Sequence, residues 1–147
     1  MFIKQISVFI ENKPGRLAEV TKYLADAGIN ILAISMADTT DFGILRLIVE
    51  DPGKTDVTLK AHSLAVKTTD VIAVAMENRP GSLAGILAEL SNHEIGIEYM
   101  YAFTTRNTDH DSMVILRLNN QEDAVKKLEN SQKIRMLTSE MVGQIRG

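Results

Sequence analysis

The sequence predicts an α+β fold that is built twice, because one short pattern recurs in both halves of the chain. Asn12–Ala18 reads Asn-Lys-Pro-Gly-Arg-Leu-Ala, and Asn78–Ala84 reads Asn-Arg-Pro-Gly-Ser-Leu-Ala. A stretch of helical period follows each copy, and a Gly-Ile pair then opens an extended run at Gly28 and at Gly96. This self-similarity indicates that each half is one structural unit.

The first half is expected to contain strands and helices in the order βαββαβ. Apolar side chains at the even positions of Ile6–Ile10 predict a strand that ends at the Pro-Gly turn. Leu17, Val20 and Leu24 share one face of a helix, and Gly28 supplies its stop. The remaining elements are predicted as a hairpin of Ile29–Met36 with Gly43–Glu50, a helix from Lys54 to His62 and a strand at Leu64–Thr68.

The second half repeats this order, so the chain is predicted to form two domains, residues 1–70 and residues 71–147. The expected elements are a strand at Val71–Met76, a helix at Ser82–His93, strands at Ile95–Thr104 and Asp111–Leu118, a helix at Gln121–Glu129 and a strand at Ile134–Leu137. Two helices on one face of a four-stranded antiparallel sheet make a ferredoxin-like domain. Thr138–Gly147 is extra, and Thr68–Asp70 joins two strands almost directly.

The spacing between the copies changes along the chain, which predicts insertions. It is 66 residues at the Pro-Gly turn, 68 at the Gly-Ile pair, and 71 between Leu45–Leu47 and Leu116–Leu118. We therefore expect two extra residues near Asn92, as a wider helix end or a bulge. Three more are expected in the second hairpin loop, around Arg106–Asp111.

The sheet face away from the helices is expected to be unusually apolar. If Ile6, Val8, Leu45 and Leu47 point to the helices, alternation sends the following residues to the other face: Phe9, Ile44 and Ile48 in the first copy, and Ala73, Ala75, Met113 and Ile115 in the second, with Arg46 and Arg117 at the margin. A solvated face is normally polar. We interpret this face as buried against another sheet or domain, which predicts a homo-oligomer, most simply a dimer; scattered apolar surface is the alternative.

Composition excludes several function classes. Sixteen basic and nineteen acidic residues give a net charge of −3, which offers no basic surface for nucleic acid or for an anionic membrane. No cysteine occurs, and no apolar run approaches a membrane span. Asp109–Asp111 is interpreted as a hairpin loop and not as a metal site. We therefore expect a cytoplasmic protein with no cofactor, no metal and no catalytic residues.

The Pro-Gly turn has the chemistry of a small-molecule site. The first-turn amides of the following helix, from Arg16, Leu17 and Ala18, suit a carboxylate. Asn12 and Asn30 each offer a donor and an acceptor. A zwitterion needs both, so an α-amino acid is the expected ligand. The competing interpretation is that Asn12 only caps the helix.

Both halves resemble ACT domains, the small-molecule sensing modules of many enzymes of amino-acid metabolism. The resemblance rests on Glu11–Ala18 with Gly28–Ile31, and on Glu77–Ala84 with Gly96–Tyr99. It implies a ferredoxin-like fold, domains that pair side by side, and an effector between the turn of one domain and the second strand of its neighbour. The implied wall residues are Asn12, Gly15, Arg16, Leu17, Ile29, Asn30 and Ile31 in one set, and Asn78, Gly81, Ser82, Leu83, Ile97, Glu98 and Tyr99 in the other.

The two implied sites differ from each other. The second copy has Glu98 where the first has Asn30, and it has Ser82 where the first has Arg16. Some relatives carry a histidine two positions before the turn asparagine, whereas this chain has Ile10 and Met76. The resulting hypothesis is a regulatory protein, not an enzyme, which binds an amino acid or related small carboxylate and acts in trans on a partner in amino-acid metabolism. The alternative is a structural subunit that docks onto a protein through its apolar sheet face.

Overall fold

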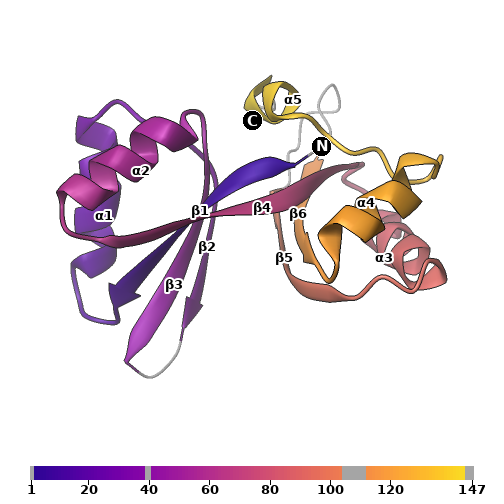
Figure 1. Cartoon of the computed structure of the whole chain (residues 1–147), viewed down its shortest axis with the longest axis horizontal. Coiled ribbons are helices and arrows are strands. Elements are labelled where there is room, and N and C mark those ends of the chain that lie inside the picture. Colours follow the sequence, from indigo (N-terminus) through magenta and orange to yellow (C-terminus); the bar gives the residue numbers. More distant parts are fainter. Residues whose placement is uncertain (1, 39–40, 104–111, 145–147) are drawn as a thin grey trace. The chain divides into compact units, whose positions relative to one another are not determined.

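The computed structural model describes residues 2–38, 41–103 and 112–144 of the chain. The chain divides into two compact units (Figure 1). The first unit is Lys4–Thr69, and the second is Asp70–Gly147 together with Met1–Ile3. Both are α+β units with antiparallel sheets, as the sequence predicts.

The first unit has the strand order β2-β3-β1-β4. Its elements are β1 (Ile3–Glu11), α1 (Arg16–Asp26), β2 (Ile31–Asp38), β3 (Phe42–Val49), α2 (Pro52–Ala61) and the start of β4 (Ala65–Met76). Val8 pairs with Leu45 and Ile6 with Leu47, and all four side chains lie in the core with Val20 and Leu24 of α1. The predicted helix-facing set is therefore confirmed.

The second unit repeats this arrangement with the order β4-β6-β5. Its elements are the end of β4, α3 (Ser82–Asn92), β5 (Ile97–Phe103), β6 (Ser112–Leu118), α4 (Gln121–Glu129) and α5 (Ser139–Gln144). The predicted strand at Ile134–Leu137 is a short segment beside β4, where Leu137 donates to the Ala73 carbonyl (2.8 Å) and Ala75 donates to the Arg135 carbonyl (2.9 Å). A bridge between Val74 and Met136 completes this contact.

Strand β4 passes through the boundary between the units without a break. We expected two strands joined by Thr68–Asp70, but Ala65–Met76 is one strand of 12 residues. No glycine or proline occurs in this segment, and its threonines and valines favour extended backbone. The boundary therefore lies within a strand and not in a loop.

The predicted insertion near Asn92 is wrong. Gly28 and Glu94 both have left-handed backbone, with φ of 71° and 56°. The next residue in each copy donates to the helix in the same way: Ile29 to the Leu24 carbonyl and Ile95 to the Leu90 carbonyl, both at 2.9 Å. The helix ends are thus equivalent, and the spacing of 66 residues continues into β2 and β5.

The predicted three-residue insertion between the hairpin strands is confirmed by the pairing on either side of the loop, but the predicted match of Leu45–Leu47 with Leu116–Leu118 is wrong. Leu47 pairs with Ile6 as Leu116 pairs with Ile72, so Leu116 is the equivalent of Leu47. Ile31 pairs with Val49, 18 residues further on, whereas Ile97 pairs with Leu118, 21 residues further on. The loop positions themselves, around Arg106–Asp111, lie outside the described residues. Both hairpins have a bulge, directly after Ile31 and directly after Ile97, so a bulge does not distinguish the copies.

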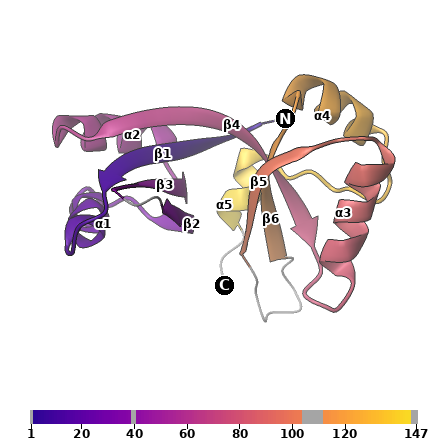
Figure 2. The same ribbon diagram turned by 90° about the horizontal axis from the view of Figure 1, so that it is seen from below.

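The face of the second sheet away from α3 and α4 is partly covered by α5. Ala73 pairs with Ile115 and Ala75 with Met113 on this face, and Met113 and Ile115 are buried. Figures 1 and 2 both show α5 on the side of β6 opposite α3 and α4. In the first unit, Phe9 pairs with Ile44 on the corresponding face, as predicted. Residues 139–144 of the extra segment thus form a structural element of the second unit.

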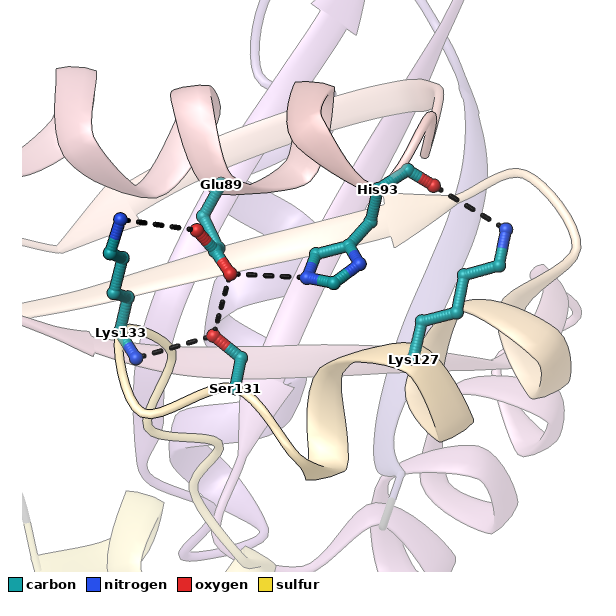
Figure 3. A network of polar contacts seen from close by, with 5 residues as sticks. All are labelled: Glu89, His93, Lys127, Ser131 and Lys133. Atoms are coloured by element: carbon teal, nitrogen blue, oxygen red, sulfur yellow. Dashed lines mark hydrogen bonds and ion pairs between the residues drawn. The ribbon is translucent and has the colours of Figure 1, made fainter.

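A buried carboxylate joins α3 to the segment that follows α4 (Figure 3). Glu89 accepts hydrogen bonds from Ser131 Oγ (2.9 Å) and from His93 Nε2 (3.1 Å), and Lys133 Nζ lies 3.8 Å away. Lys127 Nζ reaches the His93 carbonyl at 3.4 Å. The hydrogen bond from Ser131 is the main reason why the pKa of Glu89 lies below its usual value, and it outweighs the opposing effect of burial.

Candidate functional site

The two Pro-Gly turns have the same backbone geometry. Gly15 is the residue before α1, with φ 83° and ψ −13°, and Gly81 is the residue before α3, with φ 90° and ψ −15°. A Cβ on either glycine would meet nothing within 4 Å. Glycine is required here by the left-handed backbone and not by a close neighbour, which leaves the space beside each turn open.

The turns use one of the amides that were expected to be available. Arg16 donates its amide to the Lys13 carbonyl (3.2 Å), and Ser82 donates to the Arg79 carbonyl (3.3 Å). The expectation that Arg16 contributes a free amide is therefore wrong. Within the described chain, the next two amides of each helix, those of Leu17 and Ala18 in the first copy, remain for an external acceptor.

Asn12 does not cap α1. No side chain caps that helix, and Asn12 Nδ2 instead donates to Asp38 Oδ1 at 3.0 Å. The Asn12 amide also donates to the Asp41 carbonyl, again at 3.0 Å. Asn12 thus ties the turn to the end of the β2–β3 hairpin, and its side-chain carbonyl is still an available acceptor. The corresponding partner of Asn78 would be residue 104, outside the described residues.

Each turn carries an ion pair across it. Lys13 Nζ lies 2.8 Å from Glu11 Oε2, and Arg79 Nε lies 2.6 Å from Glu77 Oε2. The hydrogen bond and charge of Lys13 lower the pKa of Glu11. Arg16 also forms an ion pair, in which its Nη1 lies 2.8 Å from Glu19 Oε2. The basic side chains beside the first turn are therefore already matched by carboxylates.

Asn30 and Asn12 do not meet within one unit. Asn30 is at the start of β2, where its Nδ2 donates to Glu50 Oε1 at 3.3 Å, and Asn12 contacts Asp38 at the end of the same strand. Eight residues of strand span about 26 Å. Ile29 is buried in the core and Ile31 packs against it, so their side chains support the strand and do not line an open site.

The residue of the second copy that corresponds to Asn30 is not the expected Glu98. The backbone amide of Glu50 donates to the Asn30 carbonyl (3.2 Å), and the backbone amide of Asn119 donates to the Gly96 carbonyl (2.9 Å). Gly96 and not Glu98 therefore occupies the position of Asn30. A side chain at Gly96 would collide with Asn119 Nδ2. A small hollow of about 200 Å³ lies beside Gly96, between Asn119 and α4.

The other predicted residues of the second copy lie on its core side or its sheet edge. Leu83 and Ile97 pack partly against the core. Glu98 is the bulged residue of β5, and its side chain forms an ion pair with Arg117, whose Nε lies 3.5 Å from Glu98 Oε2. Tyr99 stands opposite Arg117 in the strand register.

Sequence reasoning missed an apolar strip beside the first turn. Leu17 of α1 is 39% exposed, and Ile34 and Met36 of β2 are 48% and 39% exposed. Ile34 and Met36 pair with Leu47 and Leu45, so all these side chains lie on the helix side of the sheet. β2 is the edge strand of its unit. Alternation along β2 could have identified the strip if the strand had been treated as an edge.

Two features of the described residues bear on other functions. No group of three or more His, Cys, Asp or Glu side chains in residues 2–38, 41–103 and 112–144 could hold a metal ion, and Asp109–Asp111 lies outside them. None of the described helices is both long enough and apolar enough to cross a membrane.

Comparison with known families agrees with the repeated turn. A family model described as an ACT domain pair matches residues 1–143. The chain therefore belongs to the ACT domain pair family, and each half has the ferredoxin-like fold of that family. No curated protein matches the chain.

Solved structures show the same fold over most of the chain. Protein BT0572 from Bacteroides thetaiotaomicron is 40% identical, with a TM-score of 0.89 over 99% of this chain and 98% of that one. The ligand-free regulatory subunit of aspartate kinase from Thermus thermophilus is 16% identical, with a TM-score of 0.58 over 86% and 90%. Aspartate kinase from Clostridium acetobutylicum is 17% identical, with a TM-score of 0.52 over 86% of this chain and 32% of that one.

Proposed function

We propose that this chain is a non-catalytic regulatory protein that binds an amino acid, or a related small carboxylate, between ACT domains. The observation that carries the proposal is the turn itself: both copies place a left-handed glycine before a helix whose next two amides have no acceptor in the described chain. These amides and the helix dipole favour a carboxylate. Asn12 adds an acceptor for an ammonium group.

The distance between Asn12 and Asn30 favours a site made by two copies of the chain. β2 is an edge strand, so a second β2 can pair with it. In an antiparallel pair, the start of one strand lies beside the end of the other. Asn30 of one copy would then approach Asn12 of its partner, with Leu17, Ile34 and Met36 covering the ligand. This arrangement makes the protein a homodimer or a larger homo-oligomer.

The proposed wall keeps the residues that the resemblance implies, with changed roles. Leu17 and Leu83 contribute main-chain amides, Asn12, Asn30 and Asn78 contribute side-chain groups, and Gly15 and Gly81 leave the approach open. Arg16, Ser82, Glu98 and Tyr99 border the two sites, and Ile29, Ile31 and Ile97 support them from the core side.

We further propose that the ligand changes how the protein acts on an enzyme partner in amino-acid metabolism, since both units of the chain fall within the matched ACT domain pair. The likeness to the aspartate kinase regulatory subunit concerns the fold, and it makes an amino-acid-metabolising enzyme the first partner to examine. A docking subunit without a ligand is the second candidate, because the exposed Ile34 and Met36 on an edge strand also suit a protein partner.

A thermal-shift panel of the twenty amino acids and common keto acids at millimolar concentration separates these functions. A compound that binds only the folded state at 100 times its dissociation constant stabilises it by about 2.7 kcal/mol, enough to raise the midpoint by several degrees. We expect one such compound for the wild type and a much smaller shift for Asn12→Ala. Asn130→Ala, an exposed asparagine after α4, is the control. A flat response across the panel would favour the docking subunit.

A further inference from the structure

The main chain at the boundary between the two units is held by two side chains of the second unit. Arg117 Nη1 donates to the Asp70 carbonyl at 2.6 Å, and Gln121 Nε2 donates to the same carbonyl at 2.7 Å. Asp70 is the first residue of the second unit after the boundary, and it lies two residues before Ile72, the first residue of β4 in register with β6. Both acceptor positions of this carbonyl are therefore occupied by side-chain donors.

Gln121 is fixed in place for this role. Its Oε1 accepts the amide of Leu118 at 3.2 Å, and the residue is 9% exposed. Arg117 is fixed from its other side by Glu98, whose carboxylate oxygen lies 3.5 Å from Arg117 Nε. Because guanidinium is planar and always charged, it can donate to a carbonyl and a carboxylate at once.

Glu98 is the most exposed of the three side chains, Arg117, Gln121 and Glu98. It is the bulged residue of β5, an edge strand, and its side chain is about half exposed. Bulges re-aim side chains, and here the bulge brings a carboxylate to Arg117 while leaving it accessible from outside. A cation that takes Glu98 would compete with Arg117 for it.

The first unit has none of these groups at the equivalent places. The strand registers match Glu98 with Leu32, the bulged residue of β2, and Arg117 with Ile48. Gln121 begins α4 as Pro52 begins α2. Leu, Ile and Pro side chains donate no hydrogen bond, so the arrangement belongs to the second unit alone.

We infer that Arg117 is a positioning residue that couples the exposed carboxylate of Glu98, on the β5 edge, to the main chain at Asp70 where the chain passes between the units. The link to regulation rests on the proposed function: an effector with an ammonium group at the β5 edge displaces Arg117 and loosens Asp70. The coupling between Glu98 and Asp70 itself needs no effector.

Hydrogen exchange measured by mass spectrometry on the full chain without any ligand tests the coupling. Arg117→Gln removes a charged donor, so we expect exchange in the peptide covering residues 70–72 to rise by roughly tenfold. Glu98→Gln, which does not touch Asp70, should raise exchange at the same residues by a smaller factor. The double variant should exchange no faster than Arg117→Gln alone, because Glu98 acts only through Arg117.

The Glu77–Arg79 pair in the same unit is the matched control, and Glu77→Gln and Arg79→Gln should leave residues 70–72 unchanged. Additive effects in the double variant would overturn the inference, as would an unchanged peptide in Glu98→Gln. If Arg117→Gln raises exchange throughout the chain, that variant is destabilised as a whole. The test then rests on whether Glu98→Gln raises exchange at residues 70–72. Failure to find any amino-acid ligand would contradict the proposed function and leave this result as it stands.

Discussion

The two units join their paired helices at the same positions but with different chemistry. In the first unit, Tyr23 of α1 stacks on His62 after α2, with ring centroids 3.7 Å apart and planes 4° from parallel. In the second unit, the equivalent contact is the hydrogen bond from Ser131 to Glu89. The equivalence follows from the backbone, since the amide of His62 donates to the Leu59 carbonyl and the amide of Ser131 donates to the Leu128 carbonyl.

This comparison separates the features that the two units share from those in which they differ. The turn, its glycine and its ion pair are repeated almost unchanged, whereas the helix contact and the strand starts have diverged. An aromatic stack needs no charge, but a nearly buried carboxylate needs partners that remain in place. The second unit should therefore be the more sensitive of the two to acid.

The largest expected effect comes from matched core deletions. Leu47 and Leu116 occupy equivalent positions and are both 0% exposed. Leu47→Ala and Leu116→Ala should each cost about 2–5 kcal/mol. Calorimetry shows whether each variant lowers one of two transitions or a single shared one. Two transitions would support the predicted domains 1–70 and 71–147, and a single transition shifted equally by both variants would contradict separate folding.

Substitution of the turn glycines should have the next largest effect. Gly15→Ala and Gly81→Ala force a side chain into left-handed backbone, which costs about 1–2 kcal/mol each. Gly85→Ala is the control, because Gly85 is inside α3 with open space around it and alanine should stabilise it by about 0.5–1 kcal/mol. Urea denaturation measures the stability of all three variants. A Gly15→Ala protein as stable as the wild type would show that the left-handed backbone shared by the two turns does not require glycine.

Acid should weaken the second unit through Glu89. Because the pKa of Glu89 is lowered in the folded state, its stabilisation is fully present above the unfolded pKa and is lost as pH falls through the folded pKa. Glu89→Gln should therefore lower the melting temperature at neutral pH and make the decline in acid shallower. Melting curves of both proteins from pH 7 to pH 3 check this, and parallel declines would show that Glu89 does not contribute.

The smallest effect on stability is expected at Asn12. Its side chain is exposed and makes one hydrogen bond, to Asp38, so Asn12→Ala should cost less than about 1 kcal/mol. If the loss is as large as that of Gly15→Ala, the side chain has a structural role that the geometry does not explain. Urea denaturation beside Gly15→Ala makes the comparison direct.

Periodicity was enough to predict the type and order of nearly all elements, since apolar positions repeat with the period of the element that buries them. The spacing between copies was wrong because Gly28 was matched to Gly96. The structure instead matches Gly28 to Glu94, a glutamate in left-handed backbone, which no glycine rule would find. The continuous β4 and the short α5 were missed because strand continuity and a six-residue helix depend on tertiary packing.

The site was predicted in part. The Pro-Gly turns follow from local sequence, because proline and glycine restrict the backbone directly. The contact of Asn12 with Asp38 joins residues 26 positions apart in the chain, and the separation of Asn12 from Asn30 depends on the length of β2. Neither could be obtained from spacing alone.

Amide NMR of the wild-type protein, titrated with the best compound from the thermal-shift panel, tests the central claim most directly. The claim places the ligand's carboxylate at the turn amides, so the account predicts that the largest chemical-shift changes occur at Leu17 and Ala18 or at Leu83 and Ala84, and that they saturate. Saturable changes confined to other residues, such as those around α4, would contradict it.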